Sequence, residues 1–235
     1  MSDRIDNEAG YVLHSRPYKE TSLLIEAFTR RHGRISLMAR GARRAHSALK
    51  ARLLPFQALS LSWFGKGPLH TLHDVEWQGD GRSLAGAGLM CGFYLNELLM
   101  RLLPPGDAHE ALYDRYLAAL RELTDGEEIE PVLRRFELAL LTELGYAQTL
   151  SQLAAGAEPV EPDIRYGYAL DTGVIAAGPH EPGYAGKTLL DMAAGDYTDP
   201  RTLAESKLLM RRLLAHYLGE QPLATRQLLI DLQKI

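Results

Sequence analysis

The first third of the chain alternates apolar and polar positions with a period of two. In residues 34–40, the apolar side chains of Ile35, Leu37 and Ala39 occupy every second position, and residues 59–64 repeat the pattern. This spacing is typical of half-buried strands. Five strands are predicted, with mostly short connections: 11–16, 22–29, 34–40, 56–64 and 69–77. Five short strands in about 70 residues predict a small closed barrel, and the oligonucleotide-binding (OB) fold is a common unit of that kind.

From Ser83 onward the apolar residues recur with helical spacing. A β-hairpin is predicted at about 164–177, around the turn Asp171-Thr172-Gly173. Helices are predicted between Ser83 and Pro104, at 108–124, from Pro131 to just before Gly145, and at 147–154, 187–194, 200–218 and 224–233. The chain is therefore predicted to be α+β, with the barrel in residues 1–80 and a mainly α-helical domain in residues 81–235.

Charge is distributed unevenly between these two parts. Between Ala27 and His73 the chain runs 47 residues without an Asp or Glu and carries nine Lys or Arg, although its net charge is −4. Residues 1–80 hold 12 basic and 8 acidic side chains, a net +4, whereas residues 81–235 hold 14 and 22, a net −8. This asymmetry indicates a polyanionic partner for the first part, and a nucleic-acid phosphate backbone is the obvious candidate.

The one long connection of the predicted barrel, residues 41–52, carries much of this charge. Strand alternation also turns Arg34 and Arg40 outward on the strand that leads into it. The basic side chains are therefore expected on one face and its adjoining loop, as a groove for phosphates requires. The candidate binding residues are Arg34, Arg40, Arg43, Arg44, Lys50 and Arg52. A simpler interpretation, in which these charges only keep a small β domain soluble, stays open at this point.

The sequence assembles no catalytic or metal-binding motif. Gly186-Lys187-Thr188 lacks the earlier glycine of a phosphate-binding loop, because that position is Glu181. His70 and His73, three residues apart on a strand, are expected on opposite faces and cannot converge on a metal. The lone cysteine, Cys91, is expected to be a small buried hydrophobe. A non-catalytic protein without cofactor or metal is favoured.

The chain is expected to be cytoplasmic. Its N-terminus has no apolar core like that of a signal peptide. The most apolar stretch, Leu84 to Leu103, contains Asn96, Glu97 and Arg101 and is expected to be a core helix rather than a membrane span.

The helix that begins at Pro131 carries a further candidate. On a helical wheel, Arg134 flanks an apolar stripe, and Glu137 falls inside that stripe, close enough to pair with Arg134. Two interpretations stay open. The pair is structural at the edge of the core, or Arg134 is a cation beside an apolar pocket, suited to a peptide with a hydrophobic end and a carboxylate.

A series of short segments runs through nearly the whole chain. They are Tyr11–Leu23 (YVLHSRPYKETSL), Phe28-Thr29, Gly33-Arg34, Gly41–Arg43, Pro55-Phe56, Tyr94–Leu98 (YLNEL), Leu133–Leu141 (LRRFELALL), Leu144–Tyr146 (LGY) and Tyr217–Gly219 (YLG). None is a chemical motif by itself, but the ordered series resembles the RecO family of bacterial recombination mediators.

The resemblance implies an N-terminal OB barrel and a helical C-terminal domain. It implies binding to single- and double-stranded DNA, annealing of complementary strands, and help in loading the RecA recombinase. The implied partners are RecR and the C-terminal tail of the single-stranded-DNA-binding protein, and Arg134 is the position matched to the cation that receives this tail. Some members carry four cysteines in a zinc module after the third helix. This chain lacks them, so no zinc site is expected.

We therefore expect a DNA-binding, strand-annealing recombination mediator, nucleoid-associated and without a membrane partner. The alternative is a scaffold whose barrel binds an acidic protein partner. A nuclease is a weaker alternative, because it would need a carboxylate cluster for a metal and the acid-free stretch supplies none.

Overall fold

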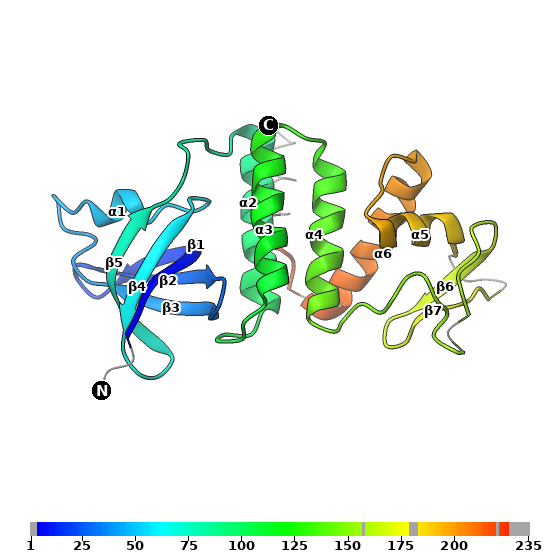
Figure 1. Cartoon of the computed structure of the whole chain (residues 1–235), viewed down its shortest axis with the longest axis horizontal. Coiled ribbons are helices and arrows are strands. Elements are labelled where there is room, and N and C mark those ends of the chain that lie inside the picture. Colours follow the sequence, from blue (N-terminus) through cyan, green and yellow to red (C-terminus); the bar gives the residue numbers. More distant parts are fainter. Residues whose placement is uncertain (1–3, 157, 179–182, 220, 226–235) are drawn as a thin grey trace. The chain divides into compact units, whose positions relative to one another are not determined.

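The computed structural model describes residues 4–156, 158–178, 183–219 and 221–225. A closed five-stranded barrel is followed by helices and a three-stranded sheet (Figure 1). The predicted α+β architecture with an N-terminal OB barrel is confirmed. The barrel strands are β1 Arg4–Tyr18, β2 Ser22–Thr29, β3 Gly33–Ala39, β4 Leu59–Phe64 and β5 Leu69–Trp77, and the short helix α1, Leu49–Arg52, lies between β3 and β4.

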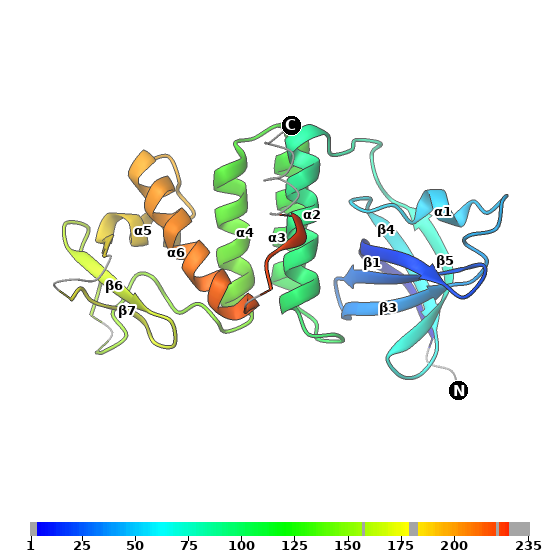
Figure 2. The ribbon, with the colours of Figure 1, turned by 180° about the vertical axis from the view of Figure 1, so that it is seen from behind.

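The barrel closes because β1 is long enough to pair at both of its edges. Its order is β1-β2-β3-β5-β4, in which only β3 and β5 run parallel. The first part of β1 pairs with β4, and from Gly10 onward β1 pairs with β2. A Cβ at Gly10 would lie 2.9 Å from Leu61 Cδ1, so a larger residue at this position, which both ladders share, would require the buried Leu61 side chain to shift. Figures 1 and 2 show this barrel from opposite sides.

Strand alternation fills the barrel as predicted. Ile35, Leu37 and Ala39 of β3 are buried, and the residues between them are partly exposed. Leu59, Leu61 and Trp63 of β4 join the same core. Because successive side chains of a strand point to opposite faces, this core leaves the intervening positions of β3 outside the barrel.

The described contacts group the chain into two compact units. Unit 1 comprises Met1–Gly126 with the segment from Leu223, and unit 2 comprises Glu127–Pro222. Helices α2 Gly86–Leu102 and α3 Glu110–Asp125 belong to unit 1 with the barrel. Unit 2 contains α4 Ile129–Glu143, β6 Arg165–Ala169, β7 Gly173–Ala176, β8 Tyr184–Ala185, α5 Gly186–Ala194 and α6 Pro200–Leu218. The change from strands to helices lies between Trp77 and Gly86, while a domain boundary at residue 80 stays a prediction.

The predicted hairpin is confirmed as β6 and β7, and a third strand, β8, extends it. The short helix predicted at 147–154 is wrong. Its backbone groups bond instead to other segments: Ala154 N–H donates to Val174 O and Leu153 N–H donates to Glu158 O. The helix predicted at 224–233 lies almost wholly outside the described residues.

Candidate nucleic-acid interface

The connection between β3 and β4 forms a basic loop, defined here as residues 40–52. Five of the six candidate binding residues lie on it and are exposed: Arg40, Arg43, Arg44, Lys50 and Arg52. Lys50 and Arg52 occupy the last turn of α1, which both views place beside β5 (Figures 1 and 2). No carboxylate of the described residues lies within ion-pair distance of any of the five. Their charges are therefore available to an external anion.

Backbone carbonyl groups, rather than carboxylates, hold the basic loop against the barrel. Arg43 N–H donates to Thr21 O at 2.9 Å, and Arg43 Nη1 donates to Lys19 O and Glu20 O at 3.3 Å each. Arg52 Nη1 donates to Val75 O at 3.2 Å. A carbonyl orients a guanidinium without cancelling its net charge. The loop is thus fixed at both ends while its positive field persists.

Three other arginines of the acid-free stretch are already neutralised. Arg31 pairs with the fully buried Glu8 at 2.6 Å, and Arg30 pairs with Glu110 and Asp114 of α3. Arg34, the sixth candidate, pairs with Glu26 at 3.1 Å. The acid-free stretch of the sequence is therefore not uniformly positive in the folded protein, because acids from elsewhere in unit 1 compensate its first part.

Arg34 is not brought together with the other five candidates. Its side chain is 15% exposed, and its Nε donates to Leu103 O at 3.0 Å. Arg34 and Arg40 stand at opposite ends of β3, roughly 20 Å apart at the usual rise of a strand. A DNA-binding role for Arg34 stays a prediction, and the geometry gives this residue a packing role between β2, β3 and the segment after α2.

The structure adds basic residues that the sequence analysis missed. The β1–β2 hairpin carries exposed Arg16 and Lys19, and Lys19 supplies one of the carbonyls that holds Arg43. Lys19 Nζ lies 5.4 Å from the centroid of the Tyr18 ring. The signal was present in Arg16-Pro17-Tyr18-Lys19, a basic pair around an aromatic residue. It was overlooked because acidic Glu20 and Glu26 separate it from the acid-free stretch.

Arg134 lies in unit 2, on α4. Its Nη2 donates to Glu137 Oε1 at 2.6 Å, and the two side chains are 13% and 0% exposed. The pairing predicted from the helical wheel is confirmed. Burial raises the pKa of Tyr197 to about 12 against the opposing field of Arg134, so an aromatic ring lies near this cation. The geometry gives Arg134 a structural role, and its role as a receptor for a peptide tail stays a prediction.

The other candidate motifs occupy structural positions. His70 contacts Trp63 and His73 contacts Phe64, neighbours that face opposite sides of β4. Gly186 N–H donates to Ile164 O, and Thr188 Oγ1 donates to Glu205. Within the described residues, no group of three or more His, Cys, Asp or Glu is placed to hold a metal ion. The described helices include none long and apolar enough to cross a membrane.

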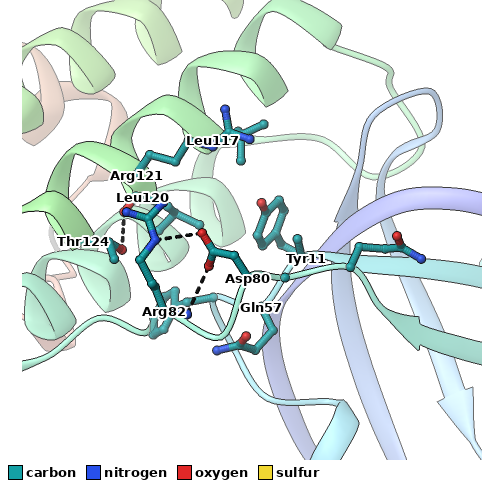
Figure 3. A pocket seen from close by; sticks show the side chains of 12 residues that line it. Tyr11, Gln57, Asp80, Arg82, Leu117, Leu120, Arg121 and Thr124 are labelled. Atoms are coloured by element: carbon teal, nitrogen blue, oxygen red, sulfur yellow. Dashed lines mark hydrogen bonds and ion pairs between the residues drawn. The ribbon is translucent and has the colours of Figure 1, made fainter.

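A cavity of about 180 Å³ lies within unit 1, between the barrel and α3. Figure 3 shows Tyr11 and Gln57 on the barrel side and Leu117, Arg121 and Thr124 on the α3 side. Arg82 at its edge is bound to Asp80 at 2.7 Å. Burial raises the pKa of Tyr11, while Arg121 lowers it, so this phenol stays protonated at neutral pH. The cavity contributes polar groups beside the barrel but no nucleophile with an adjacent base.

Comparisons with known proteins agree with this geometry. Residues 1–79 match the family model of the recombination protein O N terminal, and residues 85–227 match that of the recombination protein O C terminal. The DNA repair protein RecO of Nitrosospira multiformis is 49% identical over 236 residues, which cover 99% of this chain and 98% of that protein. RecO of Thiobacillus denitrificans is 50% identical over 242 residues, covering 99% and 94% of the two chains. The chain therefore belongs to the RecO family of DNA repair proteins.

Proposed function

We propose that this protein binds single- and double-stranded DNA through the basic loop and anneals complementary strands. One observation carries the proposal. Five exposed cations gather on one connection of an OB barrel, with no carboxylate of the described residues in ion-pair distance. Phosphates binding there would release their condensed counterions, which is the main source of affinity for DNA. Membership of a family of DNA repair proteins supports DNA as this polyanion.

Annealing needs no covalent chemistry from these residues. Two complementary strands repel each other through their phosphates, and cations on a protein surface reduce that repulsion. The guanidinium groups of Arg43 and Arg52 are held by backbone carbonyls, which fix their positions and leave their positive charge intact. Contacts to phosphates leave the base edges free to pair. The proposed activity is therefore mediation rather than catalysis.

In recombinational repair, the proposed role of the protein is to assist loading of RecA onto DNA coated with the single-stranded-DNA-binding protein. RecR and the acidic C-terminal tail of the single-stranded-DNA-binding protein are the proposed protein partners. Arg134 is the proposed receptor for that tail, supported by its position beside the apolar stripe of α4 and by the neighbouring ring of Tyr197. Its pairing with Glu137 means that a tail carboxylate would have to compete with a buried carboxylate.

The proposal is tested by the salt dependence of single-strand binding. If four phosphates are contacted, log affinity should fall against log salt with a slope near roughly −3. The double variant Arg43→Glu with Arg44→Glu should flatten that slope. Arg30→Gln is the matched control, because Arg30 is already paired with Glu110 and Asp114. An unchanged slope in the double variant would remove Arg43 and Arg44 from the interface.

Annealing is tested directly with labelled complementary oligonucleotides, bare and coated with the single-stranded-DNA-binding protein. The parent protein should accelerate annealing in both conditions, and the double variant should lose most of this effect. A protein that acts only as a scaffold for an acidic partner would not accelerate annealing of bare strands. That result would favour the scaffold function over the proposed one.

A further inference from the structure

Trp77, the last residue of β5, is an exposed aromatic residue beside the basic loop. It is 53% exposed, whereas the other tryptophan, Trp63, is 2% exposed in the barrel core. Tryptophan carries a large apolar ring, and covering that ring with another flat group is energetically favourable. Phe28, an aromatic residue of β2, is by contrast fully buried against Tyr113 and Tyr116 and is part of the core. Trp77 is therefore better placed for an external ligand than Trp63 or Phe28.

The indole of Trp77 is held in one orientation. Its Nε1 donates to Gln57 Oε1 at 2.9 Å. A Cβ at Gly79 would lie 2.5 Å from Nε1 and 3.1 Å from Cε2, so the backbone after β5 packs closely against this edge of the ring. The single polar group of the indole is thus satisfied inside the protein. What remains for a ligand is the apolar surface of a preorganised ring, which suits stacking rather than hydrogen bonding.

The same strand connects Trp77 to the cations of the basic loop. The carbonyl of Val75, two residues before Trp77, accepts a hydrogen bond from the guanidinium of Arg52. Gln78 N–H, one residue after Trp77, donates to Ala58 O. The segment that follows α1 therefore runs along the end of β5. It brings the ring and the positive charge to one part of unit 1.

The nearby acids are directed elsewhere or neutralised. Asp74 and Glu76 are exposed on β5, but strand alternation places them on the face opposite Val75 and Trp77. Asp80 is paired with Arg82 at 2.7 Å. Hydrogen bonds from the backbone and side chain of Arg82 hold the pKa of Asp80 below its usual value. On the face of β5 that carries Trp77, Arg52 is the cation tied to this strand, through Val75 O, and it has no ion pair with a carboxylate of the described residues.

We propose that Trp77 is a stacking platform for an unpaired base of single-stranded DNA whose phosphates lie on the basic loop. The inference rests on the proposed DNA-binding function and extends it from the backbone to the bases. A DNA base is a flat, uncharged ring attached to a polyanionic backbone. The base suits the indole, whose N–H is already hydrogen-bonded, and the backbone suits the cations of the basic loop. An apolar side chain of a protein partner would contact the ring but would not interact with the charges of the cations.

The test compares two ligands of equal charge, an oligothymidylate and an abasic oligonucleotide with the same number of phosphates. Trp77→Ala should weaken binding of the oligothymidylate by about 5- to 150-fold, the range expected for loss of one stacked base. Binding of the abasic ligand should be unchanged. Trp77→Phe, which keeps a smaller aromatic ring, should retain most of the affinity and serves as the second variant if Trp77→Ala folds poorly.

Fluorescence gives an independent readout from the same titration. Oligothymidylate should quench the parent protein, whereas Trp77→Phe, in which only buried Trp63 emits, should show little quenching. Equal losses on both ligands, or none, in Trp77→Ala would overturn the platform while leaving DNA binding intact. A parent protein that binds neither ligand would instead refute the proposed function, and the platform with it.

Discussion

Asn96 of α2 and Tyr116 of α3 form a buried hydrogen bond that also reaches the barrel. Tyr116 Oη donates to Asn96 Oδ1 at 2.6 Å, and Asn96 Nδ2 donates to Leu13 O of β1 at 2.9 Å. Both side chains are almost wholly inaccessible to solvent, and burial raises the pKa of Tyr116 well above its usual value. One amide thus joins two helices and a strand within the compact unit that contains the barrel.

Removing the Tyr116 hydroxyl should destabilise unit 1. Tyr116→Phe leaves Asn96 Oδ1 buried without this donor, at an expected cost of about 1–3 kcal/mol in the free energy of unfolding. Tyr113→Phe is the matched control, because Tyr113 is a neighbouring buried tyrosine of α3 without a hydrogen bond of its hydroxyl among the described contacts. Urea denaturation measures both. Equal stability of the two variants would contradict the importance of the Asn96 bond.

Paired and unpaired arginines of the acid-free stretch should behave in opposite ways. Arg34→Gln breaks the pair with Glu26 and the bond to Leu103 O, so it should lower the free energy of unfolding by about 1–3 kcal/mol with little effect on DNA affinity. Arg44→Gln removes an exposed cation and should weaken DNA binding with little effect on stability. Thermal denaturation and oligonucleotide titration of both variants separate the roles. The reverse pattern would restore Arg34 to the interface.

Arg134 should reveal its role in binding of an acidic peptide that ends in an apolar residue. If Arg134 receives the tail, Arg134→Gln should weaken that binding by about tenfold or more, because a charged contact is lost. Arg134→Lys should retain part of the affinity. Arg211→Gln is the control, since Arg211 is an exposed residue of α6 in the same unit. Equal peptide affinity in the parent and Arg134→Gln would reject the receptor role and leave the pair with Glu137 purely structural.

Glu205 should make unit 2 sensitive to acid. Burial acts to raise the pKa of this carboxyl, but hydrogen bonds from Ala185 N–H, Thr188, Arg201 and Arg165 outweigh it and lower the pKa below its usual 4.5. Because the pKa of Glu205 is lowered in the folded state, the ionised carboxyl stabilises the folded protein. This contribution is fully present above pH 4.5 and is lost as the pH falls through the folded-state pKa.

Glu205→Gln should therefore lower stability at neutral pH by about 1–3 kcal/mol and weaken the pH dependence below pH 4.5. Denaturation followed over pH 3 to 7, roughly the titration range of carboxyl groups, measures this. Glu130→Gln is the control, because its exposed pair with Lys207 is expected to contribute little. If the free energy of unfolding depended on pH in the same way in the parent and in Glu205→Gln, Glu205 would not be the source of the acid sensitivity.

The period-two and helical patterns predicted most of the elements, since both depend on local geometry and on which face meets the core. The segment 147–154 shows where local reasoning failed. Its backbone bonds to Val174 and Glu158 are formed only once the hairpin is in place. The fourth strand starts at Leu59 rather than at residue 56, and Phe56 has a positive φ of 65° that a strand does not allow.

The sequence by itself determined the barrel, the basic stretch and the family, because alternation, composition and the ordered series of segments need no long-range contact to be visible. Only the tertiary structure decided which cations stay available. Arg30, Arg31 and Arg34 meet carboxylates from Glu110, Glu8 and Glu26, whereas the basic loop meets backbone carbonyls. The physical reason is that an ion pair forms only when the two charges lie within a few ångströms of each other in space. The separation of two residues along the chain does not reveal that distance.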